Sequence, residues 1–201
     1  MNHLILLAAG NGSRFGANKL LAGRNGKPLW TYGYAVLKEA AEATGAKVKV
    51  VSRYPEILSA VGEDGVFSPE SENGLSFSVR AGVLSCGELA ADDKLLFLAA
   101  DMPYITVQTV EKLLKMPLAQ AEEEPLPLAA CAWDGEETGN PVVFSALLRE
   151  RLLLLTGDRG GKAVLRHCPD RVEKIRCSEK ELTDVDCPSD LTEKTEEEKK
   201  G

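Results

Sequence analysis

The stretch LAAGNGSRFGANK, residues 7–19, is the most informative segment of this chain of 201 residues for its fold and its ligand. It follows an apolar run that begins at Leu4 and predicts a buried first strand. Its three glycines allow a tight turn and a close approach of the backbone to a ligand. Arg14 and Lys19 add two cations to the same loop. Backbone N–H groups and fixed cations at the end of a strand are suited to bind a triphosphate.

Two common nucleotide-binding loops fit this stretch poorly. A dinucleotide fingerprint has the spacing GxGxxG and an acidic residue after the second strand. Here Gly16 comes one position late, and Arg53 follows the second predicted strand. A P-loop has a lysine and then serine or threonine after its last glycine, whereas Ala17 and Asn18 stand there. A nicotinamide-dependent dehydrogenase and a plain glycine-rich turn with solvated charges are therefore the weaker alternatives.

The composition indicates one globular domain, assigned to residues 1–191, and a charged, disordered tail over 192–201. The net charge of −7 argues against non-specific binding to nucleic acid or to anionic membranes. No apolar run approaches the roughly 18 residues of a membrane span, and no signal-peptide pattern opens the chain. We therefore expect a cytoplasmic protein. The five cysteines match neither a disulfide framework nor a zinc pattern.

Apolar strand patterns alternate with helical patterns along the chain. Strands are predicted at 3–8, 47–52, 66–67, 95–99, 128–133, 141–144 and 172–176. Helices are predicted at 28–43, 55–61, 75–84, 106–115, 146–155 and 162–167. This alternation predicts an α/β fold with a mostly parallel sheet and helices on both faces. The run from Leu95 to Ala100 has no polar alternation, so its strand is expected at the centre of the sheet.

Asp101 is the main candidate beyond the first loop. It follows the central strand in the sequence LAADMP, residues 98–103. Ligands of open α/β sheets bind at the carboxyl ends of the strands, so Asp101 is expected beside the glycine-rich loop. A carboxylate there can hold Mg²⁺ together with phosphate oxygens. The alternative is an aspartate that only ends a strand.

Four further segments carry polar side chains that ligands use. In GLSFSVRAG, residues 74–82, serine hydroxyls and an arginine lie on one predicted helix and can face a base, a ribose or a phosphate. Asn140 lies in a Gly-Asn-Pro turn, and Asp158 lies in the loop TGDRGGK, residues 156–162. The alternating acids of DVDCPSDL, residues 184–191, include Asp186, which can reach a metal. Helix capping, a plain turn and a surface loop remain the alternatives for these segments.

Taken together, these segments resemble the nucleotidyltransferases that act on the molybdenum cofactor, and the closest match is the molybdenum cofactor cytidylyltransferase subgroup. LAAGNGSRFGANK is similar to the signature loop of the wider superfamily, and the later motifs, with GNPVVF at 139–144, point to the subgroup. The resemblance covers residues 3 to about 191. It implies a Rossmann-like three-layer sandwich of the glycosyltransferase-A type.

The resemblance also implies a reaction and a set of residues. The substrate would be CTP or another NTP with Mg²⁺ or Mn²⁺, and the terminal phosphate of molybdopterin would attack the α-phosphate and release pyrophosphate. Arg14, Lys19 and Asp101 would be catalytic, and Asp101 and Asp186 would bind the metal. Nucleotide-binding residues would be Leu7, Ala8, Ala9, Gly10, Gly12 and Ser78. Asn140 and Asp158 would lie on the acceptor side, and an apo molybdenum hydroxylase would be a protein partner.

Two positions depart from the subgroup, which has a histidine where Asn140 stands and an asparagine near Ser68. Both departures concern the acceptor, and neither touches the triphosphate loop. A sugar-phosphate or polyol-phosphate nucleotidyltransferase and a non-catalytic accessory protein that carries a nucleotide or the pterin cofactor for a molybdenum hydroxylase therefore stay open as alternatives.

Overall fold

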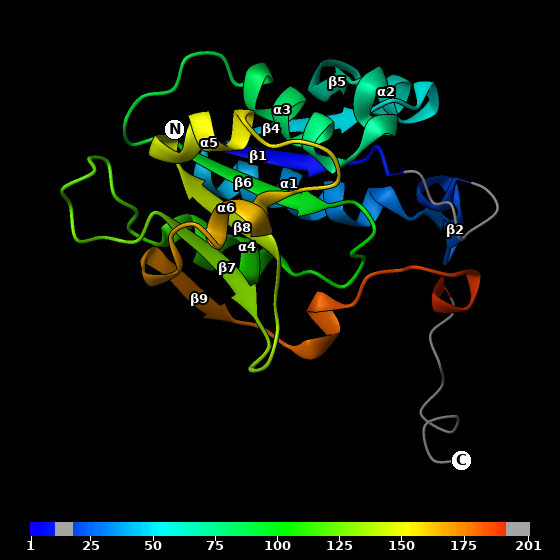
Figure 1. Ribbon diagram of the computed structural model, residues 1–201. Helices are drawn as coiled ribbons and strands as arrows, with labels where there is room; N and C mark the ends of the chain where they lie inside the picture. Colours follow the sequence, from blue (N-terminus) through cyan, green and yellow to red (C-terminus); the bar gives the residue numbers. More distant parts are fainter. Residues whose placement is uncertain (11–17, 192–201) are drawn as a thin grey trace.

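A single twisted sheet runs through the middle of the molecule, with helices on both faces (Figure 1). The computed structural model describes residues 1–10 and 18–191, so Gly12, Arg14 and the expected tail lie outside the described residues. The seven strands of the sheet lie side by side in the order β5 (Gly65–Phe67), β4 (Lys47–Ser52), β1 (Asn2–Leu7), β6 (Lys94–Ala99), β8 (Thr138–Ser145), β7 (Ala129–Trp133) and β9 (Val172–Arg176). β8 is antiparallel to both of its neighbours, and the other neighbouring pairs are parallel. The predicted mostly parallel α/β sheet is confirmed.

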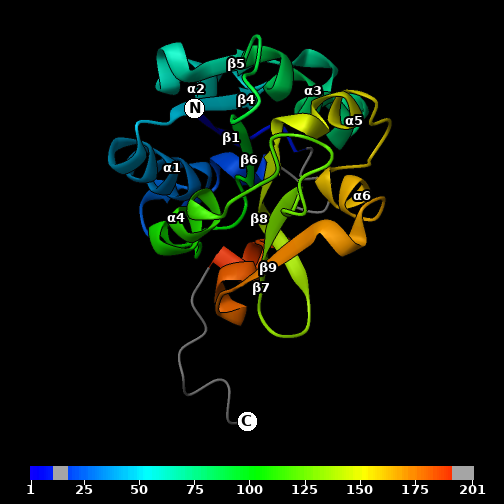
Figure 2. The ribbon, with the colours of Figure 1, turned by 90° about the vertical axis from the view of Figure 1, so that its left-hand side faces the viewer.

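The apolar residues of the central strands alternate between two cores. Leu4 and Leu6 of β1 point to one face, whereas Ile5 points to the other. The first face is covered by α1 (Trp30–Thr44), α2 (Pro55–Val61) and α4 (Val107–Lys115). The second is covered by α3 (Leu75–Ser85), α5 (Arg149–Leu153) and α6 (Gly161–Leu165) (Figure 2). β6 is the middle strand of the seven, as its unbroken apolar run predicts.

The structure differs from the predicted elements at three main points. The strand predicted at 141–144 is β8, which spans Thr138–Ser145, so Asn140 lies within the strand and not in a turn before it. The helix predicted from Pro28 begins at Trp30, because Pro28 belongs to a small hairpin of β2 (Gly23–Arg24) and β3 (Lys27–Pro28). The helix predicted at 146–155 is a 3-10 turn (Ala146–Leu148) followed by the short helix α5. Five further 3-10 turns are described besides the turn at Lys19–Leu21, and they span Gly62–Asp64, Pro69–Asn73, Pro169–Arg171, Glu179–Leu182 and Pro188–Leu191.

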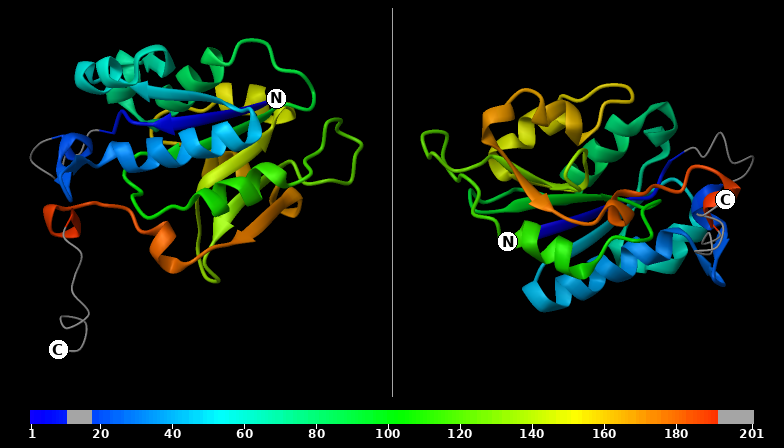
Figure 3. Two further views of the ribbon diagram at one scale, coloured as in Figure 1. Left: turned by 180° about the vertical axis from the view of Figure 1, so that it is seen from behind. Right: turned by 90° about the horizontal axis from the view of Figure 1, so that it is seen from below.

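The C-terminal segment returns to the start of the chain. After β9 it runs along the carboxyl edge of the sheet and ends near the β2–β3 hairpin (Figure 3). The N–H of Val185 donates to the carbonyl of Asp101 over 2.9 Å, which ties the segment to the loop after β6. None of the helices in the described part of the chain is long and apolar enough to cross a membrane.

Candidate active site

A cavity of about 320 Å³ lies at the carboxyl edge of the sheet. It is bounded by the ends of β1 and β6, the start of α3, the turn after Asn18, the loop before α6 and the C-terminal segment. Its lining residues are Leu7, Ala9, Gly10, Lys19, Leu20, Ser71, Gly74, Leu75, Ser78, Ala99, Asp101, Asp158 and Asp184. Segments that are far apart in sequence therefore meet at the edge where open α/β sheets bind their ligands.

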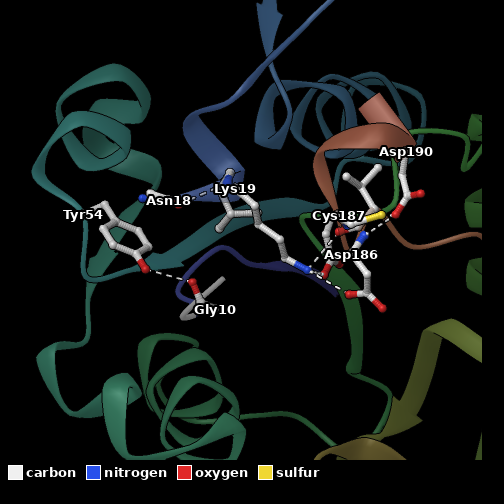
Figure 4. Close-up of polar contacts among 10 residues, drawn as sticks. Gly10, Asn18, Lys19, Tyr54, Asp186, Cys187 and Asp190 are labelled. Atoms are coloured by element: carbon white, nitrogen blue, oxygen red, sulfur yellow. Dashed lines mark hydrogen bonds and ion pairs between the residues drawn. The ribbon is translucent and has the colours of Figure 1, made fainter. Parts of the chain in front are cut away.

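Lys19 is the charged centre of this cavity. Its Nζ donates to Oδ2 of Asp101 over 2.7 Å, to the carbonyl of Val185 over 3.0 Å and to Oδ1 of Asp186 over 3.4 Å. Figure 4 shows the lysine side chain extended toward Asp186. Burial disfavours the charged amine, but the carboxylates of Asp101 and Asp186 outweigh that effect and raise the pKa of Lys19. The amine is therefore a firmly charged group that ties the first turn to the C-terminal segment.

The turn that positions Lys19 is held by its neighbour. The side chain of Asn18 accepts a hydrogen bond from the N–H of Leu20 over 3.1 Å and caps the 3-10 turn at Lys19–Leu21 (Figure 4). Leu20 is buried in the core beneath. A capped turn with a buried leucine fixes the backbone from which the lysine side chain reaches the acids.

Asp101 has one carboxylate oxygen in use and one without a partner. Oδ2 accepts from Lys19, whereas Oδ1 is buried and has no hydrogen-bond partner among the described residues. A buried unpaired oxygen costs free energy unless a ligand uses it. Within residues 1–10 and 18–191 no three His, Cys, Asp or Glu side chains form a ready metal cluster. Mg²⁺ commonly uses only one or two protein carboxylates beside phosphate oxygens and water, so the free oxygen of Asp101 fits such an ion.

Two aspartates of the C-terminal segment face this end of the cavity. Asp186 contacts Lys19, and Asp184 lines the cavity wall. Loss of solvation, followed by repulsion from the carboxylates of Asp101 and Asp186, raises the pKa of Asp184 to about 6. The carboxylates of Asp101, Asp184 and Asp186 therefore act on one another at this end of the cavity. This concentration of negative charge favours a cation at this end.

The other end of the cavity is formed by α3 and the loop before α6. Gly74 precedes α3 with φ 137°, and a Cβ atom there would lie 2.5 Å from the carbonyl oxygen of Gly157. The N–H of Ser76 donates to that same carbonyl over 3.0 Å. Only glycine permits both this φ and this close approach, which brings Asp158 to the cavity wall.

A chain of buried hydroxyls runs from this end into the protein. Ser78 Oγ donates to Ser71 Oγ over 2.8 Å, and Ser71 Oγ donates to Ser68 Oγ over 2.8 Å. Ser71 and Ser78 both line the cavity. Each hydroxyl can donate or accept, so this end offers polar groups that suit a base or a ribose.

Only some of the residues at the end of β1 line the cavity. Leu7, Ala9 and Gly10 line the cavity, and Tyr54 donates to the carbonyl of Gly10 over 2.8 Å (Figure 4). Ala8, predicted to bind the nucleotide, does not line it. Its N–H donates to Val51 and its carbonyl accepts from Ser52, so its backbone groups are already paired.

Seven of the ten predicted site residues that the structure describes line this cavity; Ala8, Asn140 and Asp186 do not, although Asp186 contacts Lys19 at its edge. Asn140 sits within β8 and is not among the lining residues. Gly12 and Arg14 fall in 11–17, outside the described residues. The prediction missed Ser71 and Asp184. The alternation of Asp184 with Asp186 was the available signal for the second of these.

Residues 4–173 match the model of the MobA-like NTP transferase domain. The chain belongs to this family. As a family member it is an NTP-dependent nucleotidyltransferase, and the family uses an NTP substrate with a divalent metal. A search of curated proteins gave no significant match.

Solved structures share the fold over almost the whole chain. A nucleotidyl transferase from Methanothermobacter thermautotroptrophicus has 24% sequence identity and a TM-score of 0.72, with 94% of each chain covered. Rv0371c from Mycobacterium tuberculosis H37Rv, in complex with manganese, has 17% identity and a TM-score of 0.68, with 94% of this chain and 95% of that chain covered. CMP:2-keto-3-deoxy-manno-octonic acid synthetase, in complex with CTP, has 15% identity and a TM-score of 0.69 at the same coverage. At these identities the likeness shows the nucleotidyltransferase fold.

Proposed function

We propose that this nucleotidyltransferase transfers CMP from CTP to the terminal phosphate of a molybdopterin-type acceptor and releases pyrophosphate. The observation that carries the proposal is the convergence of Lys19, Asp101 and Ser78 on one cavity. A cation beside a carboxylate suits a metal-bound triphosphate, and the hydroxyls at the opposite end suit a base. The choice of CTP and of molybdopterin rests on the resemblance of the motifs at 7–19, 74–82, 139–144 and 156–162.

The reaction requires in-line positioning and neutralisation of charge on the α-phosphate and on the leaving pyrophosphate. Lys19 is placed to release its carboxylate partners and donate to phosphate oxygens when the triphosphate enters. Arg14, in the same loop, is expected to add a second cation. Leu7, Ala9 and Gly10 offer the wall along which the nucleoside lies. No covalent intermediate with the protein is needed.

Asp101 and Asp186 are the residues that would hold the metal, and Mg²⁺ or Mn²⁺ would there neutralise charge on the phosphates. The buried, unpaired Oδ1 of Asp101 supports this assignment. Asp184 is a second carboxylate of the same wall. The manganese complex of Rv0371c and the CTP complex of the octonic acid synthetase support a metal and a nucleotide in this fold. Asp158 lines the same cavity and stays a proposed acceptor-side residue, as does Asn140.

Pyrophosphate release tests this proposal directly. The four NTPs are each supplied with Mg²⁺ or Mn²⁺, with and without molybdopterin, and pyrophosphate is measured. We expect release only with both substrates, and faster with CTP than with the other nucleotides. A hexose 1-phosphate and a polyol phosphate serve as competing acceptors. No release from molybdopterin with any NTP, or faster release with a sugar phosphate, would overturn the proposed acceptor. An apo molybdenum hydroxylase as recipient of the product and a cytoplasmic location belong to the same proposal.

A further inference from the structure

A second cavity, of about 460 Å³, lies on the outer face between α5 and α6. Both helices and their connection are visible on the right-hand side of Figure 2. The lining residues that bear on its chemistry are Arg151, Leu154, Leu155, Arg159, Val164 and His167. We call this cavity the α5–α6 groove. None of these residues lines the nucleotide cavity.

The groove combines an apolar floor with cations and no carboxylate. Leu155 and Val164 belong to the core beneath, whereas Leu154 is 77% exposed at the rim. The charged residues in the lining are the arginines Arg151 and Arg159, although the chain as a whole carries a net charge of −7. An acidic protein thus presents a local surface that favours anions.

The arginines of the groove have no competing partner in the described part of the chain. Among residues 1–10 and 18–191, no hydrogen bond or ion pair is formed by the guanidinium group of Arg151 or of Arg159. The Nδ1 of His167 donates to the carbonyl of Ala163 over 2.7 Å, which orients the ring at the wall of the groove. Arg151 and His167 also border a neighbouring cavity that contains Glu122 and Asp170. Arg159 does not border that neighbouring cavity, so it is the arginine of the groove that does not share a cavity wall with those carboxylates.

We propose that the α5–α6 groove binds a small organic anion with an apolar body, such as an aryl or alkyl carboxylate, sulfonate or phosphate. Its volume falls within the roughly 300–1,000 Å³ typical of small-molecule sites, which are mostly apolar with a few placed polar groups. Leu154 and Leu155 would cover the apolar body, and the guanidinium of Arg159 would bind the anionic group. The proposal does not depend on the nucleotide or the acceptor used in the active site.

The test uses 8-anilinonaphthalene-1-sulfonate, an aryl sulfonate whose fluorescence rises on binding, with the full chain. N-phenyl-1-naphthylamine has the same aromatic body without the charge. We expect the wild type to bind the sulfonate, and Arg159→Ala to weaken that binding about tenfold or more, the scale of losing one charge-assisted hydrogen bond. Binding of the uncharged analogue should change little in this variant. Leu154→Glu, at an exposed position, should weaken binding of both probes.

Arg166→Ala is the matched control, because Arg166 is an exposed arginine at the end of α6 that does not line the groove. It should bind the sulfonate as the wild type does. Thermal unfolding of each variant verifies that the fold is retained. The proposal is overturned if the wild type does not bind the sulfonate, if Arg159→Ala binds it unchanged, or if Arg166→Ala weakens it equally.

Discussion

The amine of Lys19 and the carboxylate of Asp101 are in contact at 2.7 Å, although 82 positions separate them in the sequence. The side chains are only 11% and 22% exposed. Each group therefore satisfies the other where solvent is scarce, and the same pair faces the cavity in which the triphosphate is proposed to bind. Entry of a nucleotide must exchange this ion pair for phosphate and metal contacts. The charge that is proposed to support catalysis also holds the C-terminal segment, through the carbonyl of Val185 and the carboxylate of Asp186.

Replacing Lys19 by alanine tests that dual role. We expect kcat/KM for pyrophosphate release to fall by about 10²-fold or more, the scale of losing one electrostatic donor. Lys27→Ala, which removes an exposed lysine of the nearby hairpin, is the control and should keep wild-type activity. A Lys19→Ala enzyme that transfers nucleotides at nearly the wild-type rate would remove Lys19 from the mechanism.

Replacing Asp101 by alanine tests whether its carboxylate holds the metal ion. The variant loses the unpaired Oδ1 that fits a cation, so turnover that depends on Mg²⁺ or Mn²⁺ should disappear. The measurement is pyrophosphate release against metal concentration. Asp92→Ala, an exposed acid before β6, serves as the control and should show the wild-type metal curve. The same curve for Asp101→Ala would show that this carboxylate does not hold the metal.

A cation–π stack connects the β2–β3 hairpin to the loop after Asp101. The guanidinium carbon of Arg24 lies 4.7 Å from the ring centre of Tyr104 and 5.2 Å from that of Tyr32. Arg24 is 4% exposed, and buried pairs of this kind contribute about 2 kcal/mol or more. We expect Tyr104→Ala to lower both the free energy of unfolding and kcat.

Tyr104→Phe is the matched control for this stack, because it keeps the ring and removes only the hydroxyl. It should retain stability and kcat close to those of the wild type, measured by urea unfolding and by pyrophosphate release. Loss of activity in Tyr104→Phe as large as that in Tyr104→Ala would show that the hydroxyl, and not the ring beneath Arg24, sets the position of the Asp101 loop.

The sequence predicted the sheet better than it predicted the site. The bounds of β4, β9 and α2 agree with the predicted ranges, because buried apolar periodicity and flanking turn residues mark such elements locally. The β2–β3 hairpin was missed although its signal was present. Asn25 and Gly26 both have positive φ, the turn that an Asn-Gly pair favours between two short strands.

The sequence patterns could not predict which side chains of distant segments contact one another. The pattern placed Lys19 and Asp101 at one edge of the sheet, but it treated each as a free ligand, whereas the structure pairs them. The place of Ser71 in the cavity depends on how a 3-10 turn packs against α3, which no periodicity encodes. The patterns likewise did not indicate that the N–H and the carbonyl of Ala8 pair with Val51 and Ser52.

Glu181 makes the anchorage of the C-terminal segment dependent on pH. Its carboxylate accepts from the N–H and hydroxyl of Thr106, the hydroxyl of Thr109, and the N–H and hydroxyl of Ser178. Burial opposes ionisation, but these donors outweigh it and lower the pKa of Glu181. Because the pKa is lowered on folding, the ionised carboxylate stabilises the fold fully at pH values above the unfolded-state pKa of about 4.3. This contribution is lost as the pH falls through the lower pKa of the folded state.

Glu181→Gln should therefore lower the free energy of unfolding at pH 7 by about 1–3 kcal/mol, the cost of leaving buried donors poorly paired. Between about pH 5 and pH 3, where the wild type loses the carboxylate, the stability of the variant should fall less steeply. Urea unfolding across this range measures both effects. Glu179→Gln changes an exposed residue of the same turn and should follow the wild-type curve. Parallel pH curves for Glu181→Gln and the wild type would mean that the five donors do not depend on the charge of Glu181.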